Sequence, residues 1–318
     1  MRFQQGVDAL SRQSALDPVS EVIQGAVRQI YASSGPAGRR VEDAMYGTWL
    51  GHPLHPSLTD VVIGAWTAGA TFDLLEMLGG RAFARCADGA VAIGTAAATV
   101  TAVSGLTDAQ YVVGSARRIG ILHGLLNVGA TVLQSVSLVQ RASGRRGLGR
   151  LFSAVSFAGL LMSAYLGGEL IQRYRIGVNR AADEKVPGDY VPVLPLAELP
   201  ENQLRQVDVQ GSPVLLVRRG ARIYAMHAIC THRSGNLAQG QLVDDAVQCP
   251  LHYSQFALED GHVLRGPASF PEQCLATRVR DGMIEVGPGA GLGRCRHEPA
   301  MGHVAQGEEE RMAAPAMP

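Results

Sequence analysis

The stretch CTHRSGNLAQGQLVDDAVQCPLH, residues 230–252, contains two cysteines and two histidines in the order Cys-x-His and Cys-x-x-His. Residues 233–248 separate the two pairs, and each pair is short enough to form one tight loop. The two loops can direct four metal ligands at one centre: Cys230, His232, Cys249 and His252. Two kinds of site use this donor set. One is a tetrahedral zinc ion, and the other is a 2Fe-2S cluster with thiolates on one iron and imidazoles on the other.

The residues around the ligands favour the cluster, because they resemble the Rieske family. Cys230-Thr231-His232 matches the first ligand loop of that family, and Cys249-Pro250-Leu251-His252 matches the second. Gly266-Pro267-Ala268 matches the proline loop that covers the cluster, and the resemblance extends over residues 190–288. It implies that both cysteines bind a buried iron. It also implies that both histidines bind an outer iron near the surface, where electrons enter and leave.

Two departures from the family pattern affect the expected reduction potential. Rieske proteins of cytochrome bc complexes carry an extra cysteine in each ligand loop, joined as a disulfide, where this chain has residues such as Leu251. They also use a tyrosine hydroxyl near the cluster, where this chain has Phe256, although Ser254 is retained as a hydroxyl donor to cluster sulfur. Fewer hydrogen bonds to the cluster lower its potential. The resemblance therefore implies a Rieske-type ferredoxin rather than a subunit of a quinol oxidase.

The ligand loops lie in a segment with the composition of a small all-β domain. Short apolar runs such as SPVLLVRR and ARIYAMHA alternate with glycine-containing turns such as RRGAR and RDGM. We therefore expect a Rieske 2Fe-2S domain over residues 191–288. A polar linker over 176–190 precedes this domain, and a disordered tail over 289–318 follows it.

The first half of the chain contains four apolar segments rich in small residues, which predict membrane helices. These segments are residues 57–78, 89–107, 119–140 and 151–168. Each is close to the ~20 residues that cross the hydrocarbon layer, and small residues allow membrane helices to approach closely. The first segment contains Asp60, Asp73 and Glu76, so it fits only if these acids lie near its ends or face the other helices.

Short connections between these segments predict a four-helix transmembrane bundle over residues 47–175. An N-terminal amphipathic or flexible region, 1–46, precedes the bundle and includes an amphipathic helix over residues 17–31. The resulting protein has an α + β fold in separate domains and crosses the inner membrane of a bacterium several times. Its β domain lies on the side that carries eight basic residues, against six on the other. The positive-inside rule therefore favours a cytoplasmic Rieske domain.

The run GTWLGHPLHPSLTD, residues 47–60, is a second unusual feature. His52 and His55 flank Pro53, and His123 lies about one turn inside the third apolar segment. All three fall near one membrane face in the predicted topology, where they can form a haem b site, a quinone site or a structural polar network. The pattern H-P-x-H-P before four apolar segments also resembles an uncharacterised bacterial four-helix membrane family, which implies the topology and no chemistry.

These features predict a membrane-anchored one-electron carrier. Its cofactor is a Rieske 2Fe-2S cluster, and its partners are the lipid bilayer and a redox protein or quinone. Two alternatives are a membrane quinol or ferric reductase, with the Rieske centre as relay, and a cluster-based redox sensor. We assign no catalytic residue and expect an electron-transfer protein or a component of an oxidoreductase. A complete Rieske oxygenase needs a further iron domain, for which no soluble segment is long enough. The 28 basic and 28 acidic residues give no reason to expect a nucleic acid partner.

Overall fold

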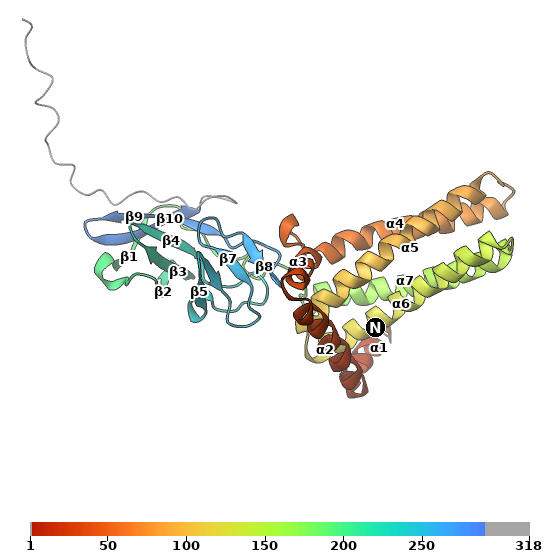
Figure 1. Ribbon diagram of the computed structural model, residues 1–318, viewed down its shortest axis with the longest axis horizontal. Helices are drawn as coiled ribbons and strands as arrows, with labels where there is room; N and C mark the ends of the chain where they lie inside the picture. The colour runs from red at the N-terminus through yellow and green to blue at the C-terminus, as the bar shows by residue number, and fades with distance from the viewer. Residues whose placement is uncertain (1, 290–318) are drawn as a thin grey trace, which may run out of the picture.

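The computed structural model describes residues 2–289 and divides the chain into a helical part and an all-β domain (Figure 1). Helices α1 to α7 lie at one end of the molecule, and all ten strands of the described residues lie at the other. This arrangement confirms the predicted α + β fold with the two classes in separate domains. The predicted disordered tail lies outside the described residues except for Gly289.

Four long helices correspond to the four predicted apolar segments, and each is long and apolar enough to cross a membrane. They are α4 (Leu54–Met77), α5 (Phe83–Asp108), α6 (Gly114–Ala142) and α7 (Arg146–Gln172). Pro56 lies in the first turn of α4, where a residue without an N–H loses no intrahelical hydrogen bond. The connections are short, so successive helices run antiparallel, as predicted.

The four helices form two hairpins, α4–α5 and α6–α7, which pack more extensively within each hairpin than against each other. A small apolar core joins the hairpins, and its buried members are Val62, Trp66, Ala98, Ala130 and Leu160. Gly94 permits close packing inside the first hairpin, because a Cβ atom there would lie 2.3 Å from Cδ1 of Trp66. Small residues therefore serve the helix contacts that the composition predicted.

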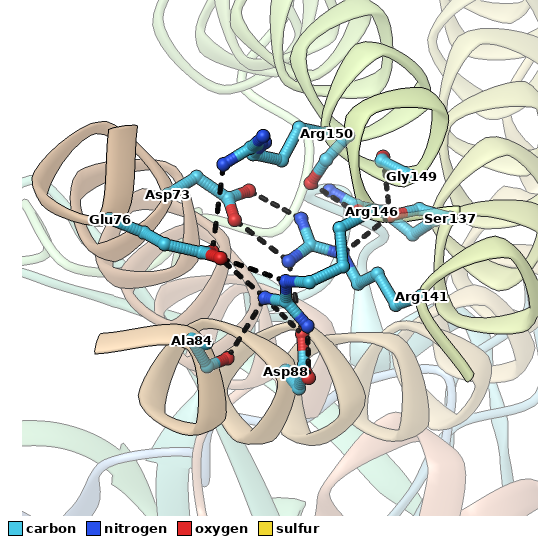
Figure 2. Close-up of polar contacts among 11 residues, drawn as sticks. Asp73, Glu76, Ala84, Asp88, Ser137, Arg141, Arg146, Gly149 and Arg150 are labelled. Carbon is cyan, nitrogen blue, oxygen red and sulfur yellow. Dashed lines mark hydrogen bonds and ion pairs between the residues drawn. The ribbon is translucent and has the colours of Figure 1, made fainter. Parts of the chain in front are cut away.

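Buried ion pairs join the two hairpins at the ends far from the β domain (Figure 2). Arg141 of α6 donates two hydrogen bonds to the carboxylate of Asp73 on α4. Arg146 of α7 contacts Glu76 at 2.9 Å and Asp88 at 2.8 Å. Asp73 and Glu76 therefore lie near the end of α4 and face neighbouring helices, which is the condition under which the first apolar segment was expected to fit.

Three further helices occupy the N-terminal region: α1 (Arg2–Ser11), α2 (Asp17–Ser33) and α3 (Gly35–Tyr46). The predicted amphipathic helix over residues 17–31 corresponds to α2. Arg118 donates to both carboxylate oxygens of Asp17, at 2.9 and 2.6 Å, and Gln24 donates to the carbonyl of Val112 at 2.8 Å. These contacts hold the N-terminal region against α6 and the loop before it. The sequence had predicted an amphipathic or flexible region here.

The β domain consists of two antiparallel sheets. The larger has the strand order β1-β10-β9-β4-β3-β2, and the smaller has the order β5-β6-β7-β8. The strands are β1 (Val191–Pro195), β2 (Leu204–Val209), β3 (Ser212–Arg219), β4 (Arg222–His227), β5 (Gln241–Val243), β6 (Ala246–Gln248), β7 (Gln255–Ala257), β8 (Val263–Arg265), β9 (Cys274–Arg280) and β10 (Met283–Gly289). One apolar core lies between the sheets and includes Leu215, Met226, Val247 and Phe256 together with Cys230 and Cys249.

The β domain contacts the helical part through α3 and two short 3-10 helices, η2 (Thr48–Leu50) and η3 (Ala109–Tyr111). The Gly266 N–H donates to Asp43 at 3.0 Å, and the Ser269 hydroxyl donates to the carbonyl of Tyr46 at 2.8 Å. A Cβ atom at Gly266 would lie 2.3 Å from the Tyr46 ring, so glycine allows this close approach. The proline loop is therefore fastened directly to the helical part.

Candidate iron-sulfur centre

Two loops with the same backbone design present the four predicted ligands. The first follows β4, and the second connects β6 to β7. In each, the cysteine carbonyl accepts a hydrogen bond from the residue four positions later, Ser234 at 2.9 Å and Tyr253 at 3.2 Å. These two residues have positive φ angles of 57° and 64°, which turn the chain sharply. The sequence spacing thus folds into two matching turns that point their cysteines and histidines the same way.

The structure pairs the two predicted cysteines with each other and the two predicted histidines with each other. Cys230 and Cys249 are 1% and 2% exposed, and their thiols lie within hydrogen-bonding reach of each other. The rings of His232 and His252 have centroids 5.0 Å apart. Gly235 keeps space free beside the second thiol, because a Cβ atom there would lie 2.8 Å from the Cys249 sulfur. The donor set therefore has an inner thiolate side and an outer imidazole side, which fits the mixed ligation of a Rieske cluster.

Both histidines have the protonation state that a metal requires. Burial, together with the neighbouring His252 and Arg233, lowers the pKa of His232 to about 3. Burial also lowers the pKa of His252. Neutral imidazole is the form that binds metal, so neither ring must lose a proton near neutral pH before it coordinates iron.

The proline loop, residues 266–270, closes over the two ligand loops. The Ala268 N–H donates to the Ser254 hydroxyl at 2.9 Å. Thr231, between the first two ligands, donates its hydroxyl to the carbonyl of Phe270 at 2.8 Å. Ser254 is fully buried and uses its oxygen as an acceptor, so its hydrogen is available to the cluster side. This geometry agrees with the hydroxyl donor that the resemblance implied at this position.

Glu272 is a site residue that sequence reasoning missed. Its side chain is 1% exposed, and one carboxyl oxygen accepts a hydrogen bond from the Thr231 N–H at 2.8 Å. The other carboxyl oxygen, Oε2, has no hydrogen-bond partner among residues 2–289. Burial raises the pKa of Glu272 well above its ordinary value. Burial therefore favours the uncharged form of this carboxyl group, and no local sequence pattern distinguishes it from a surface glutamate.

The imidazole side of the centre faces the helical part of the same chain. The His252 ring lies 4.9 Å from the ring of Tyr111 in η3, and Arg233 donates to the Tyr111 carbonyl at 2.7 Å. His52 packs edge-on against Phe270 of the proline loop at 5.5 Å. The outer ligands are thus partly covered, whereas the sequence predicted that they lie near the surface.

The three predicted site histidines of the helical part separate into two places. His55 and His123 come together between the hairpins, with ring centroids 6.2 Å apart. His52 instead lies at the contact with the β domain, where it is exposed except for its contact with Phe270 and its hydrogen bond to the Pro53 carbonyl at 3.1 Å. The predicted set of three is therefore a facing pair and one separate residue.

Comparisons with known proteins agree with both parts of this structure. Residues 189–279 match the family described as "Rieske [2Fe-2S] domain", and residues 51–180 match the family described as "Predicted membrane protein (DUF2231)". The Rieske match covers both ligand loops and the proline loop, and the DUF2231 match covers α4 to α7. The family that matches the four-helix half is thus one of predicted membrane proteins.

The curated relatives align with the β domain alone. The 3-phenylpropionate/cinnamic acid dioxygenase ferredoxin subunit of Shigella flexneri serotype 5b (strain 8401) is 37% identical over 92 residues, which are 28% of this chain and 85% of the relative. The same subunit of Escherichia coli (strain K12) has the same identity and coverage. Among solved structures, the ferredoxin of carbazole 1,9a-dioxygenase from Nocardioides aromaticivorans IC177 is 28% identical with a TM-score of 0.31, covering 32% of this chain and 99% of that chain.

The buried cysteines, the adjacent imidazoles and the covering proline loop suit a 2Fe-2S cluster, and the ferredoxin relatives share this part of the sequence. The chain therefore belongs to the Rieske family, and it carries its Rieske domain on a DUF2231 helical domain.

Proposed function

We propose that this protein is a membrane-anchored one-electron carrier whose Rieske centre exchanges electrons through the helical part of its own chain. The observation that carries this proposal is the contact between the imidazole side of the centre and Tyr111 at 4.9 Å. When bound, a 2Fe-2S cluster takes up and releases one electron. Cys230 and Cys249 would hold its inner iron, and His232 and His252 would hold its outer iron.

The helical surface supports membrane anchoring. Large apolar side chains on the outer faces of the four helices are solvent-accessible in the isolated chain; for example Ile93, Leu125, Val132 and Leu161 are 62%, 52%, 56% and 57% exposed. In α4 to α7, between 17% and 28% of the most apolar stretch is buried inside the protein. Soluble proteins rarely expose contiguous apolar surface of this extent, whereas lipid tails cover it in a membrane protein.

The ferredoxin relatives support the proposal that this membrane-anchored carrier also exchanges electrons with a soluble protein. Their names place them as ferredoxin subunits of a dioxygenase, so a reductase or an oxygenase-type protein is the class of partner that we propose for this chain. The exposed Leu251 and Tyr253, 53% and 57% accessible beside His252, form the part of the imidazole side that the helical part leaves open. A partner that docks there approaches the outer ligands without separating the two domains.

A second candidate function is a two-cofactor membrane oxidoreductase, in which the Rieske centre relays electrons to or from a group in the helical part. The observation that favours it is the facing pair His55 and His123, 6.2 Å apart. Ionisable side chains inside membrane helices are rare and mark functional sites by default.

The first test is the electron paramagnetic resonance spectrum of the reduced full-length protein in detergent. We expect a Rieske signal in the wild type, its loss in Cys230→Ser and its retention in Cys86→Ser, because Cys86 is an exposed free thiol outside the site. A Rieske signal that survives Cys230→Ser would contradict the ligand assignment. A protein that binds zinc, and no iron after anaerobic reconstitution, would contradict the electron carrier.

A further inference from the structure

The facing histidines lie at the same level of two parallel helices, one in each hairpin. His55 of α4 and His123 of α6 are 68 residues apart, and so are Asp73 and Arg141, which meet at the other end of the same helices. The same offset relates Val62 to Ala130 in the core between the hairpins. Each hairpin thus contributes one histidine to a common position. We propose that His55 and His123 are the two axial ligands of a b-type haem.

Each imidazole is held in the same way by the second helix of its own hairpin. His55 Nδ1 lies 2.9 Å from the Thr101 carbonyl, and His123 Nδ1 lies 2.9 Å from the Ser163 carbonyl. A carbonyl oxygen accepts only, so each Nδ1 carries the hydrogen and each Nε2 carries the lone pair. A metal-binding histidine has this arrangement, with its other nitrogen donating to a carbonyl that fixes the ring.

A glycine one helical turn beyond each carbonyl makes room for the ring. A Cβ atom at Gly105 would lie 2.7 Å from Cε1 of His55, and a Cβ atom at Gly167 would lie 3.1 Å from Cε1 of His123. The repetition of carbonyl, glycine and histidine in both hairpins is not required for helix packing. It places two oriented imidazoles at one level between the hairpins, where both rings are still partly accessible.

The separation of the rings fits one metal ion between them. A metal lies ~2.1 Å from an imidazole nitrogen. Two rings that bind one ion from opposite sides therefore have centroids about 6 Å apart. The observed distance between the centroids of His55 and His123 is 6.2 Å. Within residues 2–289, the groups hydrogen-bonded to the pair are the two carbonyls, the Ser163 hydroxyl and the Asn127 amide, and none is a carboxylate or thiolate. A bare ion would lack protein ligands here, whereas haem brings its equatorial nitrogens and needs only two axial ligands.

Haem binding requires a local change at one ligand. Asn127, one turn after His123, donates its amide to Nε2 of that ring at 3.1 Å. This contact agrees with an unprotonated Nε2, and the amide must turn away when iron takes its place. The two hairpins pack less extensively against each other than within themselves, so a flat ring between them disturbs fewer contacts than one inside a hairpin.

A short chain of contacts joins this site to the Rieske centre. Thr231, between two cluster ligands, donates its hydroxyl to the Phe270 carbonyl at 2.8 Å. The ring centroids of Phe270 and His52 are 5.5 Å apart, and His52 precedes His55 by three residues in the chain. The haem site is inferred from the hairpins alone, but its role as electron partner rests on the proposed function. One electron that leaves the reduced cluster converts ferric to ferrous haem, so the exchange balances within the chain.

The test is a reduced-minus-oxidised spectrum with a pyridine haemochrome assay on the full chain, expressed in haem-replete cells and purified in detergent. We expect about one haem b per chain in the wild type and its loss in both His55→Ala and His123→Ala. His52→Ala is the matched control and retains the haem, because His52 lies outside the pair. The Rieske signal persists in all variants, which separates failure of the haem site from failure of the proposed carrier.

His123→Met tests ligation if an alanine variant does not fold. Methionine can replace one axial histidine and raises the midpoint potential of the haem, so a retained haem with a higher potential supports the assignment. Three outcomes overturn it: no haem in the wild type, even after titration with haemin; a full haem complement in both alanine variants; or one bound metal ion per chain at the histidine pair in place of haem.

Discussion

Glu272 shows how a single buried group can link the stability of the Rieske domain to pH. It is 1% exposed, one carboxyl oxygen accepts a hydrogen bond from the Thr231 N–H at 2.8 Å, and Oε2 has no partner among the described residues. Burial favours the uncharged form and raises the pKa in the folded state. The unfolded chain ionises the same group above a pKa of ~4.3. Unfolding therefore releases a proton at higher pH, and the folded state loses stability as pH rises through this window.

We expect Glu272→Gln to stabilise the protein near neutral pH, because glutamine imitates the uncharged acid and keeps an oxygen for the Thr231 N–H. The difference between variant and wild type should grow above pH ~4.3 by at most ~1.4 kcal/mol per pH unit. Thermal denaturation of the cluster-loaded protein between pH 4 and pH 8 measures this difference in stability. Glu198→Gln is the control, because Glu198 is exposed. A difference independent of pH would contradict a neutral Glu272.

The hairpins are held together at their distal ends by charge rather than by apolar packing (Figure 2). Arg141 is 6% exposed and pairs with Asp73, which is 7% exposed; it also contacts Asp88 at 3.1 Å. A buried ion pair is weak evidence for stability as such, but removal of one partner leaves an uncompensated charge. At the level of the element, α4 tolerates its acids because α6 and α7 each supply an arginine at the same height.

We predict that Arg141→Ala lowers the free energy of unfolding by ~3–5 kcal/mol, because Asp73 is then buried without a partner. Arg150→Ala, which removes a contact of 3.8 Å to Glu76, should change it by less than ~1 kcal/mol. The double variant Arg141→Met, Asp73→Leu should recover most of the loss. Denaturation in detergent micelles provides the measurement, and equal effects of Arg141→Ala and Arg150→Ala would contradict this account.

On the scale of the whole molecule, the position of the Rieske domain determines on which side of the bilayer the proposed carrier would exchange electrons. All four helices place their Rieske-proximal ends on one side, because α4 and α6 begin there and α5 and α7 return there (Figure 1). The basic residues on that side slightly outnumber those on the other, so the proposed orientation is cytoplasmic. Lys185 in the linker is exposed and accessible to trypsin.

Trypsin added to sealed inverted membrane vesicles should therefore release a fragment that carries the Rieske centre. The same treatment of intact spheroplasts should leave the chain whole, and Lys185→Gln should slow the release in vesicles. Immunoblotting against each half of the chain detects the products. Cleavage in spheroplasts together with protection in inverted vesicles would place the Rieske domain on the opposite side.

The sequence by itself determined the four apolar helices and the separation into a helical part and an all-β domain, and it predicted the cluster ligands. These features depend on local spacing and composition: Cys-x-His and Cys-x-x-His each fit one turn, and a membrane helix needs only a long apolar segment. Even the condition on Asp73 and Glu76 followed from the composition of one segment.

Only the tertiary structure decided which distant residues meet. It covered His252 with Tyr111, buried Glu272 beside Thr231, paired Asp73 with Arg141, and separated His52 from the facing pair His55 and His123. The offset of 68 residues between α4 and α6 was present in the sequence, but the small and aliphatic residues at most corresponding positions do not reveal it. Contacts between segments far apart in the chain depend on how whole elements pack, and no single stretch of residues encodes that packing.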